Sequence, residues 1–228
     1  SISPAIDYIR VGSELSCDEC YRDRLIENVL LSSTKRKDVA DRIKRCRIFV
    51  GTVASISGKP ELFRLKHFNV AIVDEATQIL EPQLLGILCA RGGDGRDAID
   101  KFVLIGDHKQ LPAVVLQRSE QAEVYDESLQ SIGLRNLKDS LFERLYRSVR
   151  RFVSEDEEKT NEDGNMEDVN SCNKRTDQTM QRAYDMLCKQ GRMHPLVACF
   201  ANQAFYENRL ESVGLPHQLE SDDAIVRL

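Results

Sequence analysis

The chain has 228 residues, of which 41% are hydrophobic and 30% are charged, and its formal net charge is −5 at pH 7. No apolar run approaches the roughly 20 residues of a membrane-spanning helix, so we expect no membrane partner, and we expect no signal peptide. Seven cysteines, an odd number scattered along the chain, favour a reduced compartment, and the predicted setting is therefore intracellular and cytoplasmic.

The negative charge is concentrated in one segment. Residues 155–168 hold eight acids and one lysine, so the rest of the chain is close to neutral and a nucleic-acid partner is not excluded. Cys17 and Cys20 have the spacing of half a zinc site, but the sequence contains no second pair with this spacing. A zinc site is therefore the less favoured interpretation of these cysteines.

The N-terminal residues predict one strand followed by two helices. Residues 6–11 are typical of a short strand, and apolar residues between 25 and 30 recur at helical spacing. Residues 34–47 predict a second helix surrounded by seven lysines and arginines. Such a basic run is more often a solvated helix face than a nucleic-acid contact, and we favour the solvated face.

Three short apolar runs, 48–50, 70–73 and 102–105, indicate strands that are buried on both faces. Between the last two, Pro82 begins a helix at the first helical position, where its missing N–H costs nothing. A strand, helix, strand order implies parallel strands joined by crossover helices. The predicted fold class is therefore α/β, with a parallel sheet and flanking helices.

The last third of the chain changes character. Asp139 is the predicted N-cap of a helix whose apolar stripe continues to Val149. Residues 154–178 are polar, acidic and almost free of core residues, which predicts a flexible insertion or linker. Apolar residues between 180 and 188 resume helical spacing, and Pro195 begins a further helix.

Polar side chains follow two of the predicted strands. Asp74 and Glu75 come directly after the run 70–73, and Asp107 and Gln110 follow the run 102–105. Ligands of open α/β sheets bind at the carboxyl ends of the strands, so we expect these groups to share one edge. An acid that holds Mg²⁺ and a second group that orients water are what nucleotide hydrolysis needs, whereas the plainer alternative is two acids in a solvated turn.

The segments around these residues resemble superfamily 1 helicases of group B. "VDEATQ" at 73–78 and "FVLIGDHKQLPAVV" at 102–115 are similar to motifs II and III, and "DSLFERL" at 139–145 and "QGRMHPLVACFANQAFYENRL" at 190–210 are similar to further signatures. That branch includes the RNA helicase of nonsense-mediated decay and the helicase-nuclease that trims Okazaki fragments. The resemblance covers about a quarter of the chain, in family order, and implies a RecA-like fold that binds ATP.

The resemblance also implies roles for individual residues. Asp74 is expected to be the Mg²⁺ carboxylate and Glu75 the general base that polarises water. Gln110 is expected to sense the γ-phosphate, with Asp107 and Gln78 also at the nucleotide.

Two further positions are assigned in the same way. Arg192 resembles the motif IV arginine that reaches the γ-phosphate from a second RecA-like domain, although Gly191 stands where the family usually has tyrosine. Thr52 resembles a residue that contacts the nucleic-acid backbone, while a threonine that only closes a turn is equally expected there.

The phosphate-binding pattern G-x-x-x-x-G-K-[ST] does not occur in this sequence. Gly51 and Gly58 precede a lysine but are seven residues apart, and Pro60 stands where a hydroxyl is needed. We therefore expect an incomplete P-loop NTPase core. Its predicted parts are a first RecA-like domain without its P-loop at 1–153, the acidic linker at 154–178 and the start of a second domain at 179–228.

The predicted function is a fragment of an ATP-dependent helicase or translocase on single-stranded DNA or RNA, inactive alone and completed by the remaining parts of the same helicase. The alternative is a degenerate helicase-like domain that serves as an interaction module without ATPase activity. A nuclease that uses the same acids with metal alone is less favoured, because it needs more clustered acids or histidines than this region holds.

Overall fold

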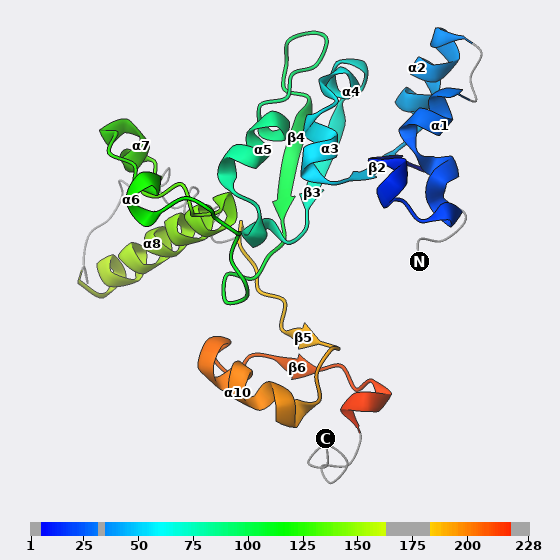
Figure 1. Cartoon of the computed structure of the whole chain (residues 1–228). Coiled ribbons are helices and arrows are strands. Elements are labelled where there is room, and N and C mark those ends of the chain that lie inside the picture. Colours follow the sequence, from blue (N-terminus) through cyan, green and yellow to red (C-terminus); the bar gives the residue numbers. More distant parts are fainter. Residues whose placement is uncertain (1–5, 32–34, 163–182, 220–228) are drawn as a thin grey trace. The chain divides into compact units, whose positions relative to one another are not determined.

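The structure is a computed structural model that describes residues 6–31, 35–162 and 183–219, with its elements labelled in Figure 1. The chain divides into two compact units, Ser1–Leu145 and Tyr146–Leu228. None of the helices in the described ranges is both long and apolar enough to cross a membrane.

Two pairs of parallel strands lie in the first unit. β1 (Tyr8–Val11) pairs with β2 (Ile48–Gly51), and β3 (Phe68–Val73) pairs with β4 (Ile99–Leu104). The described strands of this unit form two separate pairs rather than one continuous sheet. Helices connect the strands along the chain, so the prediction of an α/β fold with parallel strands is confirmed.

The first strand pair packs against α1 (Ile26–Leu31) and α2 (Arg36–Arg45). These helices lie where the sequence predicted them, although the predicted first residue of the second helix, Thr34, lies outside the described residues. Lys37, Lys44 and Arg45 of α2 are exposed, whereas Ile43 of the same helix enters the core. That core consists of Ile9, Val11, Ile26, Val29, Ile43, Cys46 and Leu62.

Three helices cover one face of the second strand pair: α3 (Val53–Ser57), α4 (Pro60–Leu65) and α5 (Glu81–Leu88). Pro82 occupies the first turn of α5, as predicted. A Cβ at Gly86 would lie 3.1 Å from the Cβ of Ser57, so the glycine allows α5 to lie closely against α3.

The opposite face of β3 and β4 is apolar but uncovered in the described part of the chain. The exposed fractions are 47% for Val70, 68% for Ile72, 40% for Val103 and 42% for Ile105. The strands were predicted to be buried on both faces, and the structure corrects this expectation: only the face beneath α3, α4 and α5 is buried. Parallel strands are normally covered on both sides, so this face has the composition of a buried surface.

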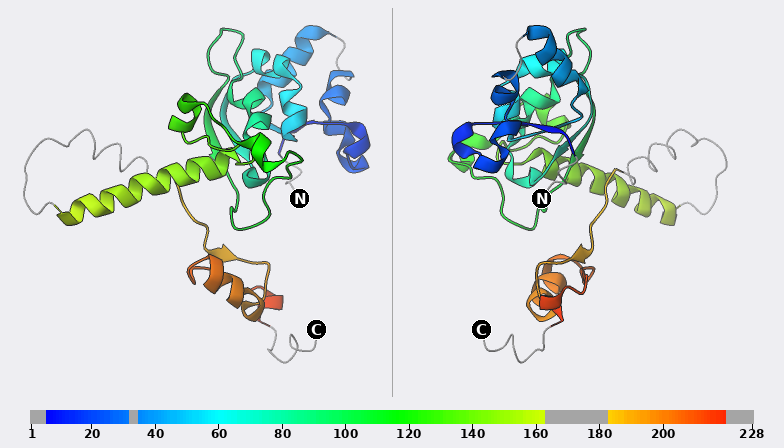
Figure 2. Two further views of the ribbon diagram at one scale, coloured as in Figure 1. Left: turned by 60° about the vertical axis from the view of Figure 1, so that its left-hand side comes forward. Right: turned by 90° about the vertical axis from the view of Figure 1, so that its right-hand side faces the viewer.

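Ser140, not Asp139, caps the long helix α8 (Leu141–Glu162), which is continuous in both views of Figure 2. Glu143 N donates to Ser140 Oγ at 3.2 Å, and Ser140 N donates to Glu143 Oε2 at 3.4 Å. This reciprocal pair is a capping box, which uses a hydroxyl one residue later than the predicted aspartate. The helix extends into the predicted linker at 154–178, of which 163–178 lie outside the described residues, and the predicted domain boundaries remain predictions.

Short elements complete the first unit. The 3-10 helices η1, η2 and η3 and the single-turn helices α6 and α7 lie in the connections between the longer elements. Their bounds are Glu14–Ser16, Glu19–Arg24, Ala76–Gln78, Ser119–Ala122 and Glu127–Ser131.

The second unit contains a parallel pair of two-residue strands, β5 (Lys189–Gln190) and β6 (Glu211–Ser212), with α10 (Pro195–Phe205) and η4 (Pro216–Gln218). The predicted helix at Pro195 is confirmed. The helical spacing at 180–188 was misleading, because the described residues 184–188 are extended or irregular and lead into β5. Met180, which belonged to that pattern, lies outside the described residues.

Two neighbouring leucines of α5 test the packing of the first unit. Leu84 is 1% exposed within the core beneath the turn that follows β3, whereas Leu85 is 47% exposed. Leu84→Ala should lower the free energy of unfolding by about 2 to 5 kcal/mol, and Leu85→Ala by less than about 1 kcal/mol. Urea unfolding of the two variants measures both values, and equal losses would contradict the assigned faces of α5.

Candidate functional site

The two acids predicted at the sheet edge lie immediately after β3. Glu75 has a left-handed backbone conformation with φ of 50°, which is uncommon for a residue with a side chain. Glu75 N donates to Asp74 Oδ1 at 3.0 Å, and Gln78 Nε2 donates to Glu75 Oε2 at 3.2 Å. This turn, residues 74–78, is called the acid turn below. It presents both carboxylates together, and the amide of Gln78 holds the carboxylate of Glu75.

The turn after β4 lies directly against the turn after β3. Ile105 N donates to the carbonyl oxygen of Val73, and Ala76 N donates to the carbonyl oxygen of Ile105, each at 2.8 Å. A Cβ at Gly106 would lie 3.0 Å from Thr77 Cγ2 and 3.1 Å from Thr77 N. A glycine at 106 thus allows the two backbones to approach closely, and the structure brings 74–78 and 105–107 together at one edge.

Asp107 and Gln110 form a small network of their own. Gln110 Nε2 donates to Asp107 Oδ2 at 2.8 Å, and Lys109 N donates to Asp107 Oδ1 at 2.9 Å. Within the described residues no hydrogen bond joins Gln110 to Asp74 or Glu75. The aspartate therefore orients the amide, and the two turns meet through their backbones.

Asp74, Glu75, Gln78 and Gln110 are exposed, so the two acids lie in a solvated turn, as the plainer alternative had it. Neither acid forms an ion pair with any side chain that the structure describes. The physical reason is position: Val73 is the last buried residue of β3, and the acids lie beyond it on the rim. Exposed carboxylates remain available to a cation from solution.

A magnesium ion fits the donors of this turn. Mg²⁺ is usually held by one or two carboxylates with substrate phosphates and water, rather than by a cage of protein ligands. Asp74 is exposed, and its Oδ1 already accepts a backbone N–H, which fixes the orientation of the carboxylate. Within the described residues there is no cluster of three or more histidines, cysteines or acids, the kind of group that a protein-only metal centre requires.

Thr52 is the N-cap of α3. Its Oγ1 accepts from Ser55 N at 3.2 Å and donates to Ser55 Oγ at 2.9 Å. The structure thus gives Thr52 the turn-closing role that was one of two expectations, and a nucleic-acid contact remains a prediction.

Arg192 lies in the second unit, in the loop between β5 and α10. Its backbone N donates to Gln190 Oε1 at 3.1 Å, while its side chain is exposed and has no hydrogen-bonding or ionic partner in the described ranges. His194, two residues further on, caps α10: its Nδ1 accepts a hydrogen bond from Leu196 N at 3.3 Å.

Gly191 departs from the family pattern, and the structure shows what surrounds it. A Cβ at this position would lie 3.1 Å from Leu215 Cδ1 and 3.3 Å from Val213 Cγ2. Both neighbours are tips of partly exposed side chains, so they occupy the space into which a side chain at 191 would extend.

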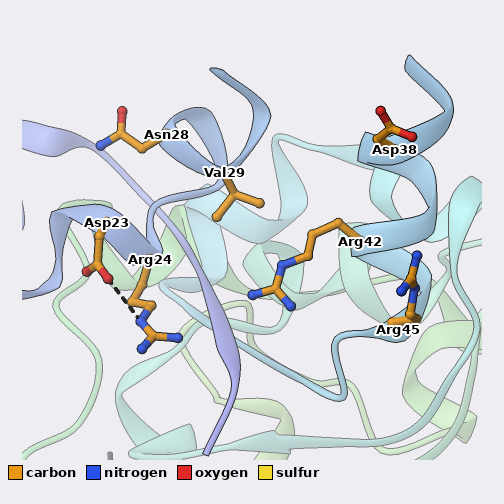
Figure 3. A pocket seen from close by; sticks show the side chains of 7 residues that line it. All are labelled: Asp23, Arg24, Asn28, Val29, Asp38, Arg42 and Arg45. Atoms are coloured by element: carbon orange, nitrogen blue, oxygen red, sulfur yellow. Dashed lines mark ion pairs between the residues drawn. The ribbon is translucent and has the colours of Figure 1, made fainter. Parts of the chain in front are cut away.

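A separate hollow lies between η2, α1 and α2, as Figure 3 shows, and contains none of the predicted site residues. Arg42 donates to both carboxylate oxygens of Asp7, at 2.5 and 2.7 Å, and Arg24 pairs with Asp23 at 3.2 Å. The hollow is therefore lined by arginines whose charges are largely matched by aspartates. Its lining residues are Asp23, Arg24, Asn28, Val29, Asp38, Arg42 and Arg45.

Sequence reasoning missed an ion pair between the first residue of α5, Glu81, and α8. Arg144 of α8 donates through Nε to Glu81 Oε2 at 2.8 Å, pairs with Oε1 through Nη2, and donates through Nη1 to the carbonyl oxygen of Ile132 at 2.9 Å. Both side chains are mostly buried. Arg144 lies inside the recognised segment 139–145, but Glu81 lies outside every recognised segment, and the 63 residues between them leave no local pattern that predicts the pairing.

Comparisons with known proteins indicate the class to which this chain is similar. A family model described as an AAA domain matches residues 14–118, just under half of the chain, and includes both turns. This match and the short parallel strand pairs are consistent with a RecA-like P-loop fold.

Several curated helicases are similar to the chain. The DNA replication ATP-dependent helicase/nuclease of Homo sapiens is 36% identical over 97 residues, 42% of this chain and 8% of that protein. An uncharacterised ATP-dependent helicase of Methanocaldococcus jannaschii is 26% identical over 189 residues, 83% of this chain and 20% of that protein. The DNA polymerase alpha-associated DNA helicase A of Saccharomyces cerevisiae is 29% identical over 121 residues, 50% of this chain and 16% of that protein. The chain spans about a tenth of the length of the helicase/nucleases that it matches.

The ion pair beside the hollow predicts a pH dependence of stability. The hydrogen bond from Arg42, with added attraction from Arg24, holds the pKa of Asp7 below its usual value. Because the folded pKa is lowered, the pair stabilises the fold above the unfolded pKa of aspartate, near 3.9, and this contribution is lost as the pH falls through the folded value.

Asp7→Asn should therefore lower the Tm at pH 7 and lower it less at pH 3. Thermal unfolding of both proteins at the two pH values checks this, and a difference independent of pH would contradict the assignment.

Proposed function

Because the chain contains a superfamily 1 helicase-like segment, we propose that it supplies the hydrolytic edge of an ATP-dependent helicase that moves along single-stranded DNA or RNA. The observation that supports this most is the backbone contact between the turns after β3 and β4, which gathers acids and amides at the carboxyl ends of neighbouring parallel strands. This is the edge at which open α/β sheets bind ligands.

In this proposal Asp74 holds Mg²⁺ and Glu75 acts on the attacking water. When bound, the ion would neutralise charge on the phosphates. Glu75 Oε2 accepts a hydrogen bond from Gln78, which orients the carboxylate and leaves Oε1 to hold a water and receive its proton. Gln78 thereby belongs to the nucleotide site through Glu75.

Gln110 is proposed to sense the nucleotide at the same edge. Its amide is oriented by Asp107, and its loop follows the turn that is hydrogen-bonded to the acid turn. A change in the acid turn therefore reaches this loop through two backbone hydrogen bonds rather than through a side-chain contact.

Arg192 is the proposed arginine of the second RecA-like domain. Its guanidinium is exposed and unpaired within the described residues, whereas its backbone is held. Guanidinium groups pair with phosphate oxygens through a planar fork, so an uncommitted arginine on a fixed loop suits contact with the γ-phosphate when two domains close around ATP.

The uncovered face of β3 and β4 supports one further partner. Val70, Ile72, Val103 and Ile105 present an apolar surface of the kind that parallel sheets bury. We propose that the P-loop segment of the same helicase covers this region and completes the sheet. Thr52, at the end of β2, remains the proposed contact with nucleic-acid phosphates.

The experiment is ATP hydrolysis by the full-length protein on DNA and RNA single strands. Glu75→Gln should retain ATP binding and lower kcat by about 100-fold or more, because the general base is lost while the magnesium carboxylate remains. Asp74→Asn should instead weaken magnesium-dependent ATP binding.

Glu61→Gln is the matched control, since Glu61 is an exposed acid of α4 in the same unit and forms no side-chain hydrogen bond or ion pair within the described residues. It should leave turnover unchanged. Retained turnover in Glu75→Gln would refute the assigned base, and an absence of strand-stimulated hydrolysis in the wild type would favour the interaction-module alternative.

A further inference from the structure

The loop that carries Arg192, residues 190–193, is held by hydrogen bonds from the side chain of its own first residue, Gln190. Gln190 Oε1 accepts from Arg192 N at 3.1 Å and from Met193 N at 2.9 Å. Its Nε2 donates to the carbonyl oxygen of Met193 at 2.8 Å. One side-chain amide thus bridges the beginning and the end of a four-residue loop.

Gln218 of η4, which is not part of the loop, also hydrogen-bonds to it. It is 3% exposed, and both ends of its amide are bonded. Nε2 donates to the carbonyl oxygens of Gln190 at 3.1 Å and Met193 at 2.9 Å. Oε1 accepts from Gly214 N at 3.0 Å and Leu215 N at 3.1 Å. The carbonyls that Gln218 binds lie on either side of Gly191 and Arg192.

His217 supplies a weaker third contact from the solvent side. Its Nε2 lies 3.0 Å from the carbonyl oxygen of Gly191, which can only accept, so the ring carries a proton on Nε2. The carbonyls of Gln190, Gly191 and Met193 and the amides of Arg192 and Met193 are then all bonded. The side chain of Arg192 is left exposed.

We propose that Gln218 is a positioning residue for Arg192, which rests on the proposed role of Arg192 at the γ-phosphate. An amide suits this place because it carries two donors and an acceptor in one plane, and a buried polar group is tolerated only when such bonds are made. A catalytic arginine acts only from a defined position, and a shift of about 1 Å can cost on the order of 100-fold in rate. Gln218 fixes the backbone from which the guanidinium extends.

The test uses the full-length protein with Gln218→Met, which keeps the length of the side chain and removes its hydrogen bonds. The matched control is Asn202→Leu. Asn202 also bonds both backbone groups of one residue, Leu210, at 2.9 and 3.1 Å, in the same unit but away from the loop. We expect Gln218→Met to lower kcat for strand-stimulated ATP hydrolysis by about 10- to 100-fold. Asn202→Leu should change it by less than about threefold, although both variants lose two or more hydrogen bonds.

A positioning role also predicts that the effect depends on Arg192. In an Arg192→Ala background, Gln218→Met should cause no further loss of kcat, because the group that it positions is gone. A rate loss that persists in this background, or one equal to that of Asn202→Leu, would overturn the proposal. Arg192→Ala without any loss of kcat would instead show that the proposed function of Arg192 is wrong.

If Gln218→Met does not fold, His217→Ala provides a second test of the proposal. His217 is exposed, so its removal leaves the buried amide network intact. We expect a loss of about three- to tenfold in kcat that again disappears in the Arg192→Ala background. An unchanged kcat in His217→Ala, together with failure of Gln218→Met to fold, would assign the network to stability alone and overturn the proposal.

Discussion

The candidate site depends on the backbone contact between two turns. The strand ladder of β3 and β4 continues past the last residue of each strand, through Val73, Ile105 and Ala76, and Gly106 allows Thr77 to approach. Because this contact uses main-chain atoms, it does not depend on the side chains of the two turns. Those side chains can therefore interact with a ligand. Buried Val73, Leu84 and Leu141 lie beneath the contact and fix it to the core. A side chain at 106 would separate the turns and remove the shared edge.

Much of the first unit follows from the sequence. Short continuous apolar runs at 48–50, 70–73 and 102–105 predicted three strands, and the structure has strands at 48–51, 68–73 and 99–104. The uncovered face of β3 and β4 shows the limit of that logic. An apolar run indicates that both faces of a strand are suited to burial. It does not indicate which other part of the protein covers each face.

Other features depend on contacts that no local pattern encodes. Residues 184–188 have helical spacing but lead into β5, since pairing with β6 more than 20 residues away determines their conformation. Asp139 and Ser140 are both good capping residues, and only the position of Glu143 favours the serine. Gln218 lies outside every recognised motif, and its importance appears only when its bonds to Gln190 and Met193 are seen. The meeting of the turns after β3 and β4 at one edge was predictable from the sequence, whereas the residues that support the loop of Arg192 were not.

Charged groups in this structure fall into two classes, and the distinction bears on function. Arg144 with Glu81, and Arg42 with Asp7, form multiple bonds within their own unit and contribute to folding. Asp74, Glu75 and Arg192 make no ion pair within the described residues, yet each extends from a backbone that is tightly hydrogen-bonded. A charge without a partner on a rigid support contributes little to stability. Its backbone is already ordered, however, so only the side chain remains to be ordered when a ligand of opposite charge binds. Each unit therefore presents its unpaired charge separately, carboxylates at 74 and 75 and a guanidinium at 192.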